Sequence, residues 1–220
     1  GSTLSSGTLT LSGGTASLGA LAFSGGALTQ GATNLTTGSI TFNNSGTFTR
    51  NSGAGTLSIG GPVAVGAQTF TLTNNAATTV ALPTVSIAGG TITQTAGNVT
   101  ISTLQPTSGT STVVQQSGAG TLDISTVSLG NGATIAMQPA IGKTTTIGTV
   151  SMFSGGPSTF RNSGAGNATI SASTLTLTDG SLTENTGGGT LTIGLADKNG
   201  GSGIATITNT SGQIDITTLT

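Results

Sequence analysis

One short sequence word recurs along the whole chain, and this repeat limits the possible folds more than any other feature. Four clear copies, at Asn51, Gln116, Asn162 and Asn185, begin with Asn or Gln, pass through a Gly-rich turn and end in an alternating segment such as Gly-Thr-Leu-Thr-Ile, and five weaker copies occur between and beyond them. Consecutive copies begin 20–24 residues apart, and this regularity identifies the chain as a repeat array. The first residues of the nine copies are Gln30, Asn51, Asn74, Gln94, Gln116, Gln138, Asn162, Asn185 and Asn209.

Each repeat contains three short segments in which aliphatic residues alternate with Thr or Ser, as in 121–124, 126–129 and 91–93. Period-two alternation predicts strands with one apolar and one polar face. A meander of antiparallel hairpins gives no reason for a three-strand period, whereas a solenoid stacks the three strands of one coil on those of the next. We therefore predict an all-β fold, a parallel β-helix (β-solenoid) of about ten three-strand coils.

The solenoid is expected to occupy residues 1–220 as a single unit. The array begins inside a repeat-like word at 7–11 and stops inside a strand at 216–220, so neither end carries a cap. Uncapped ends expose unpaired strand edges, which favour association. We expect a piece of a longer chain or a unit that stacks end to end.

Stacking predicts three inward columns of aliphatic residues. The first includes Leu9/Leu11, Leu57/Ile59, Leu122/Ile124 and Leu191/Ile193, the second Leu21/Phe23, Val85/Ile87 and Val127/Leu129, and the third Leu28, Phe48, Phe70, Ile92, Phe160 and Leu182.

The nine Asn and Gln markers are predicted to lie in one further column. Amides stacked at the strand spacing of about 4.7–4.8 Å hydrogen-bond along the axis, as in cross-β ladders. The alternative is that Asn simply suits the turn before Gly. Gln is a poor turn former, which favours the ladder. The role is structural in both cases.

Composition excludes several classes of function. Four basic side chains cannot neutralise a row of phosphates, so we expect no nucleic-acid partner. The chain has no His and no Cys, the usual zinc ligands and thiol nucleophiles. No apolar run is long enough to span a bilayer. We expect no transmembrane segment, metal or cofactor.

The acidic residues also argue against an enzyme. Asp123 and Asp215 are predicted in one outward column, four coils and roughly 19 Å apart, which is too far for paired carboxylates to cooperate. Asp179 and Glu184 flank a turn, and Glu184 is expected to pair with Arg161 one coil before. The segment 197–203 resembles a calcium loop but occurs once, and we interpret it as an enlarged corner. We predict no catalytic residues.

Thr-x-Thr pairs are the most regular surface feature. They resemble the flat Thr arrays on the ice-binding faces of some antifreeze proteins, although Thr is also a common exposed strand residue. Lateral packing between rods is a third use, because the chain carries little charge to oppose it. The possible binding faces contain Thr47, Thr49, Thr69, Thr71, Thr91, Thr93, Thr190 and Thr192.

Words such as Gly-Thr-Leu-Ser-Ile at 55–59 and Gly-Thr-Leu-Thr-Ile at 189–193 resemble the Thr/Gly-rich β-solenoids of bacterial surface proteins. The nearest families are autotransporter passenger domains and filamentous-haemagglutinin-like adhesins. The resemblance implies secretion, a right-handed three-sided coil and a role as stalk, adhesin or matrix fibre. We expect an extracellular structural rod that self-associates end to end or laterally. An adhesin for a glycan or host protein and an ice-binding protein are the alternatives.

Overall fold

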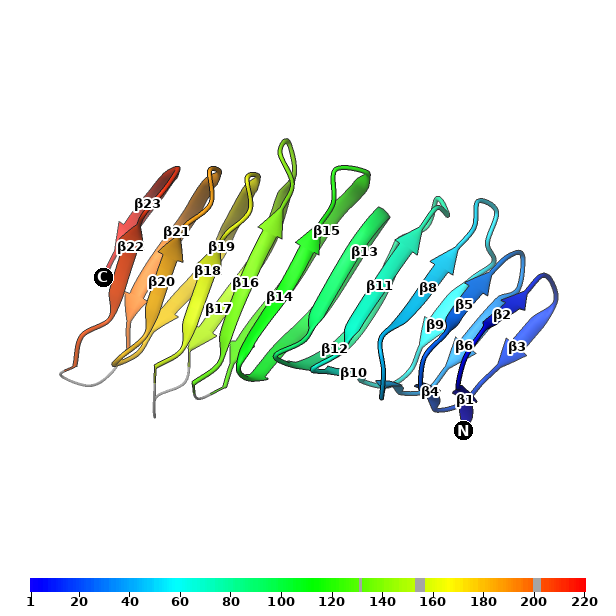
Figure 1. Ribbon diagram of the computed structural model, residues 1–220. Coiled ribbons are helices and arrows are strands. Elements are labelled where there is room, and N and C mark those ends of the chain that lie inside the picture. The colour runs from blue at the N-terminus through cyan, green and yellow to red at the C-terminus, as the bar shows by residue number, and fades with distance from the viewer. Residues whose placement is uncertain (131, 153–156, 200–202) are drawn as a thin grey trace.

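The computed structural model describes residues 1–130, 132–152, 157–199 and 203–220. These residues form a parallel β-solenoid of about nine turns, with strands, turns and bends but no helix. The two termini lie at opposite ends of the stack (Figure 1). Every strand pairing within the described ranges is parallel and joins one coil to the next, as expected for a solenoid. The predicted fold class is confirmed.

One long ladder, here called sheet I, runs the length of the solenoid. Its strands are β2 (Thr8–Leu11), β5 (Ala27–Gln30), β8 (Gly46–Arg50), β11 (Thr69–Asn74), the first part of β13 (Thr91–Ser108), β14 (Thr110–Gln115), β16 (Thr134–Pro139), β18 (Thr159–Asn162), β20 (Leu182–Asn185) and β22 (Thr206–Asn209).

A second ladder, sheet II, is also continuous from end to end. Its strands are β1 (Ser2–Leu4), β4 (Leu21–Phe23), β7 (Ile40–Phe42), β10 (Val63–Gly66), β12 (Val80–Ala88), the later part of β13, β15 (Ala119–Leu129), β17 (Thr144–Met152), β19 (Asn167–Leu177), β21 (Thr190–Lys198) and β23 (Gln213–Leu219).

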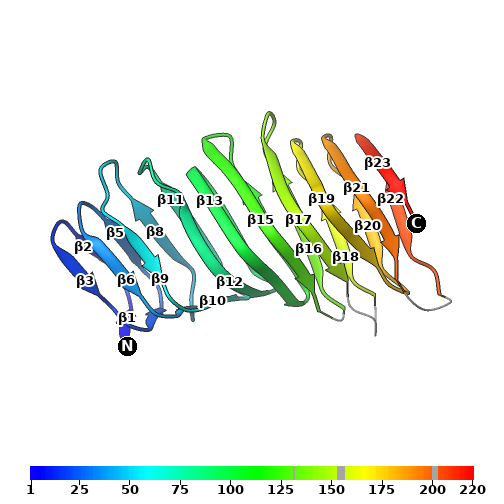
Figure 2. The same ribbon diagram turned by 180° about the vertical axis from the view of Figure 1, so that it is seen from behind.

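The cross-section changes along the axis. The first coils contain a short third ladder, sheet III, made of β3 (Thr15–Ser17), β6 (Asn34–Thr37) and β9 (Leu57–Ile59). From β12 onward, one long bent strand in each coil takes the place of a sheet III strand and a sheet II strand together. Figure 2 shows these long strands from behind.

Like residues stack on like residues, as the repeat predicts. Ile124 pairs with Ile101 and Ile147, and Val127 pairs with Leu104 and Val150. The shortest step of sheet I, from Thr8 to Ala27, and the longest, from Ala136 to Arg161, each lie one residue outside the expected 20–24. Turns at the corners absorb these differences without changing which face of a strand points inward.

The interior is a continuous apolar column, and most predicted inward residues are buried in it. Two assignments are wrong. Leu9 and Leu11 pair with Leu28 and Gln30, so they belong to sheet I and not to the first predicted column. Leu182 lies on the outer face, and its neighbour Thr183 is fully buried instead. A shift of one residue reverses the face in a strand, which explains the second error.

No helix among the described residues is long and apolar enough to cross a membrane.

Candidate functional site

Six of the eight predicted Thr residues lie together on the outer face of sheet I. Thr47 pairs with Thr71, which pairs with Thr93 on the following coil. Thr69 and Thr91 form a parallel column beside them, and Thr49 stacks on Thr73. Thr190 and Thr192 lie elsewhere, on the outer face of sheet II, where Thr192 stacks between Thr169 and Asp215. The Thr pairs therefore form two separate surfaces.

The amide markers divide into two groups. Five are buried at the inward end of a sheet I strand, and Asn209 takes the corresponding place on the last coil, where it is exposed. The remaining three are exposed on the outer side of the corner. The buried markers are Gln30, Asn74, Gln94, Asn162 and Asn185; the exposed three are Asn51, Gln116 and Gln138.

The prediction for the exposed three is wrong by one residue. The inward positions are taken by Arg50, Gln115 and Met137, each one residue earlier. Alternation fixes this, because a residue three places after an inward residue must point outward. In sheet I the correct inward residue stands two places after the preceding inward residue, as Arg50 does after Phe48. That even spacing was the sequence signal for the true column.

Among the described residues, the buried amides hydrogen-bond to one another along the axis only in the last coils. Asn162 Nδ2 donates to Asn185 Oδ1 at 3.0 Å, and Asn185 Nδ2 donates to Asn209 Oδ1 at 3.3 Å. Asn162 Oδ1 has no hydrogen-bond partner among the described residues, because apolar Met137 pairs with Asn162 from the preceding coil.

Elsewhere the amides brace the corner turns. Gln30 Nε2 donates to the carbonyl oxygens of Thr33 at 2.8 Å and Thr56 at 2.9 Å. Gln94 reaches the carbonyl of Thr121 at 2.9 Å, and Gln115 that of Gly120 at 2.8 Å. Thr33 and Thr56 lie outside the strands, whereas Gly120 and Thr121 lie at the start of β15, so these bonds tie the end of a sheet I strand to the segment that follows the corner.

Arg50 is a buried charged residue of the amide column that the sequence did not predict. Its guanidinium is buried in the amide column, and burial lowers its pKa from the ordinary value. Nη1 donates to Asn74 Oδ1 at 3.2 Å and Nη2 donates to the Gly55 carbonyl at 2.7 Å. Its hydrogen-bond partners among the described residues are all neutral, so the cation is held by dipoles and not by a carboxylate.

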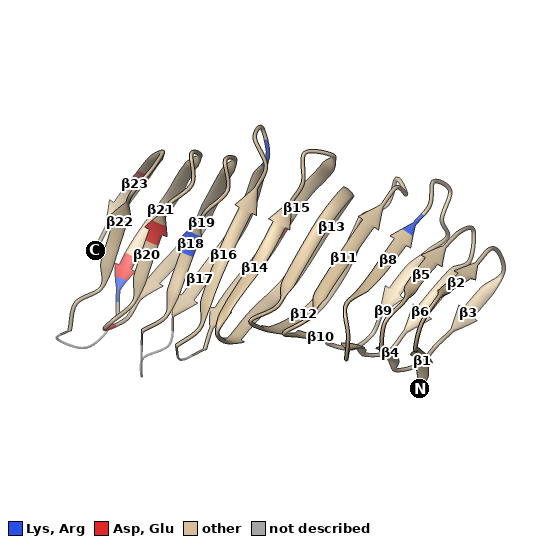
Figure 3. Cartoon of the chain, viewed as in Figure 1, with Lys and Arg blue, Asp and Glu red and all other residues tan. Residues whose placement is uncertain are grey.

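The other charges gather in the second half of the solenoid (Figure 3). Arg161 and Glu184 stack on adjacent coils of sheet I and form the predicted ion pair at 2.6 Å. Lys198 and Asp179 form a second pair, also at 2.6 Å, which the sequence analysis did not anticipate. Hydrogen bonds from Lys198 and from the Gly203 backbone lower the pKa of the Asp179 carboxyl.

The remaining acids stay apart. Asp123 and Asp215 occupy one outward column, separated by Thr146, Thr169 and Thr192, as predicted. No three acidic residues cluster in the described ranges. Of the predicted enlarged corner at 197–203, residues 200–202 lie outside the described part of the chain.

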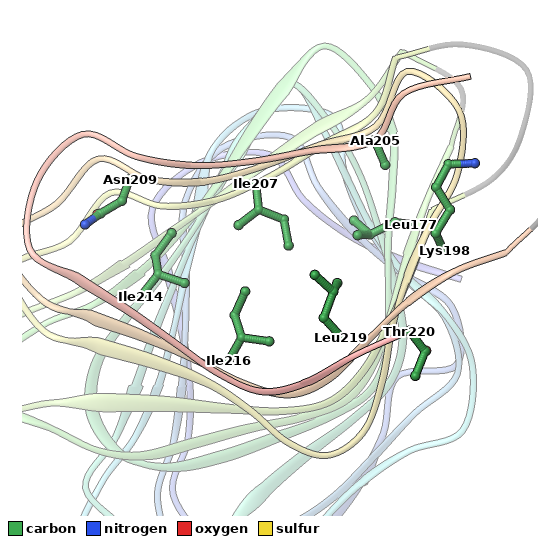
Figure 4. Close-up of a pocket in the computed structure, with 9 residues that line it drawn as sticks. All are labelled: Leu177, Lys198, Ala205, Ile207, Asn209, Ile214, Ile216, Leu219 and Thr220. Atoms are coloured by element: carbon green, nitrogen blue, oxygen red, sulfur yellow. The ribbon is translucent and has the colours of Figure 1, made fainter. Parts of the chain in front are cut away.

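The C-terminal end of the stack is hollow and apolar. The hollow holds about 560 Å³ and lies over the last coil, with Ile207, Ile214, Ile216 and Leu219 pointing into it (Figure 4). Leu219 is 66% exposed. Apart from the first coil, the inward residues elsewhere in the described stack lie between two coils.

Comparison with known proteins adds no assignment to these features. No family model, curated protein or solved structure matches the chain. The outer Thr face of sheet I and the apolar end are therefore interpreted from their own geometry.

Proposed function

We propose that the chain is an extracellular structural protein, a stalk, fibre or matrix component whose coils form a rigid rod that lengthens end to end. The parallel ladders that run along the axis through all coils carry this proposal, and the apolar hollow over the last coil is a surface on which a further coil can stack. Apolar surface of that kind is stabilised when it is removed from water. A coil of the same design is the surface that fits it.

The N-terminal end of a second copy offers such a coil. Its strands β1, β2 and β3 present Leu4, Leu9, Leu11, Ala16 and Leu18, which are only partly buried. They occupy the same three sides of the cross-section as the last strands, β22 and β23. Unpaired backbone edges on both ends would then join in parallel ladders. A head-to-tail contact that does not close produces a filament.

The rod geometry also supports a mechanical role. Parallel ladders run along the axis through about nine turns, which at about 4.8 Å per coil gives a length of roughly 43 Å. We also propose that the protein is secreted and related to the autotransporter and haemagglutinin-like solenoids. The repeat words at 55–59 and 189–193 support this part of the proposal.

Electron microscopy at increasing protein concentration, with sedimentation velocity alongside, tests the proposal. We expect filaments many coils long for the 220-residue chain. Ile207→Lys places a charge in the hollow and should leave single short rods, whereas Thr206→Lys, on the outer face of the same strand, should still assemble. Circular dichroism confirms that both variants fold. Single short rods of the unmodified chain at every concentration would contradict the proposal.

A further inference from the structure

The outer face of sheet I changes character halfway along the solenoid. From β2 to β14, six successive strands present mainly Thr, with Ala27 and Val114 as the interruptions. We call this surface the Thr face. It consists of Thr8, Thr10, Ala27, Thr29, Thr47, Thr49, Thr69, Thr71, Thr73, Thr91, Thr93, Thr110, Thr112 and Val114.

The Thr face is regular in two directions. Paired Thr residues on adjacent coils repeat at the strand spacing of about 4.8 Å, and outward residues along one strand repeat at about 6.6 Å. The Thr side chain is branched at Cβ and stiff about χ1. With the backbone held in ladders on both sides, hydroxyl and methyl groups are fixed in a two-dimensional array. The members of this array are partly or fully exposed.

The Thr face is also neutral. Arg50 is the only charged side chain before Asp123, and it points into the interior with 1% exposure. In Figure 3 the blue segment at the end of β8 is this residue. Beyond β14 the same sheet face carries Arg161, Glu184 and Leu182, so the regular array stops there.

The outer face of sheet II in the same coils does not repeat Thr as densely. Along sheet II the corresponding outward column reads Thr3, Ala22, Thr41, Ala64, Ser86 and Gln105. In these coils the regular Thr array is therefore a property of sheet I, and not only of the composition of the chain.

We propose that the Thr face binds ice. A partner for this surface must be uncharged, flat and periodic at a few ångströms in both directions, and must accept and donate hydrogen bonds. The surface of an ice crystal has these properties. Hydroxyl groups held at fixed positions can hydrogen-bond to water molecules of the ice lattice, as protein groups bond to ordered water at other interfaces. The methyl groups between them carry no charge that would compete for this water. This function goes beyond the proposed rod.

A crystalline polysaccharide is the other flat, neutral partner. Surfaces that bind sugars stack aromatic rings on them, because the large ring face buries much apolar area. The chain has no Trp or Tyr, and the five Phe side chains in the described ranges are buried. The Thr face offers no such platform, which favours ice.

Thermal hysteresis and ice-crystal shaping, measured on the 220-residue chain, test the proposal. We expect measurable hysteresis, and loss of most of it in Thr71→Lys/Thr93→Lys, which places two long charged side chains on adjacent strands of the Thr face. The matched control is Thr169→Lys/Thr192→Lys on adjacent strands of sheet II, which should retain the activity. Circular dichroism checks that both lysine variants fold. If Thr71→Lys/Thr93→Lys does not fold, Thr71→Val/Thr93→Val takes its place, because it removes only the hydroxyl groups.

Absence of hysteresis in the unmodified chain, or equal loss in both lysine variants, would overturn the assignment. Loss of lateral association in Thr71→Lys/Thr93→Lys without any ice activity in the parent would show that the face binds a second copy instead. Ile207→Lys separates this proposal from end-to-end assembly, because it blocks stacking and leaves the Thr face intact.

Discussion

Arg50 Nε donates a hydrogen bond of 2.9 Å to Gln30 Oε1 on the preceding coil, and both side chains are buried. The same guanidinium reaches Asn74 on the following coil. One cation thus joins three consecutive coils from inside the stack. A buried charge is costly unless its donors are satisfied, and here neutral oxygens satisfy them.

We predict that Arg50→Leu lowers the free energy of unfolding by about 2–4 kcal/mol, because it leaves Gln30 Oε1 and Asn74 Oδ1 without a donor inside the protein. Arg161→Leu, which breaks a partly exposed pair, should cost about 1 kcal/mol or less. Urea unfolding of the two variants measures both values. An Arg50→Leu protein as stable as the parent would show that the cation is not a brace.

The sequence was sufficient for the solenoid because the repeat spacing and the alternation agree in nearly every coil. It was insufficient for Arg50, because charged residues are almost never fully buried without a charged partner. The marker words at 51 and 116 begin with the first residue of the turn. Strand alternation counted from Phe48 or Val113 instead predicts Arg50 and Gln115 as the inward residues.

The candidate sites depended on register more than on composition. The Thr pairs were evident in the sequence, but their separation into two faces follows from the pairing of Thr71 with Thr47 and of Thr192 with Thr169. Coil lengths vary, so the alignment of one repeat on the next cannot be read from spacing alone.

The amide column offers a matched comparison. Asn185→Ala removes a buried amide that donates to Asn209 and to the Gly189 carbonyl at 3.0 Å, and we expect it to lower the free energy of unfolding by about 2–3 kcal/mol. Gln116→Ala removes an exposed amide and should change stability by less than about 0.5 kcal/mol. An equal loss of stability in the two variants, measured by thermal unfolding, would support the predicted column of nine amides.

Thr183 is predicted to be a site where an apolar residue stabilises the fold. Its hydroxyl is buried without a hydrogen-bond partner in the described structure, between Phe160 and Ile207 on the adjacent coils. Thr183→Val has nearly the same shape and should raise the free energy of unfolding by about 1 kcal/mol. Thr192→Val on an outer face is the control and should have little effect. A less stable Thr183→Val protein would mean that the hydroxyl is satisfied.

The Asp179–Lys198 pair predicts a small acid dependence. The pKa of Asp179 is lowered in the folded chain, so its contribution to stability is present above the ordinary carboxyl value of about 3.9 and is lost as pH falls through the lowered value. Melting temperatures measured from about pH 5 downward should fall less for Asp179→Asn than for the parent. The effect is modest because the pair is solvated. Parallel curves would contradict the prediction.

Gly46 makes room for aromatic packing across the interior. Phe23 and Phe42 stack with ring centroids 4.7 Å apart, and Phe42 lies 4.7 Å from Phe70, which pairs with Gly46 in sheet I. A Cβ on Gly46 would lie 2.7 Å from Cδ1 of Phe23. The rings from sheet II therefore fill the space that a side chain on Gly46 would occupy.

We predict that Gly46→Ala lowers the free energy of unfolding by about 1–3 kcal/mol through overpacking. Gly13→Ala is the control, since a Cβ there meets no atom within 4 Å. The double variant Gly46→Ala/Phe23→Leu tests the cause, because a smaller side chain at position 23 relieves the clash. A double-mutant cycle should give a favourable interaction between the two changes. Strictly additive losses would show that Gly46 is required by the backbone and not by the ring of Phe23.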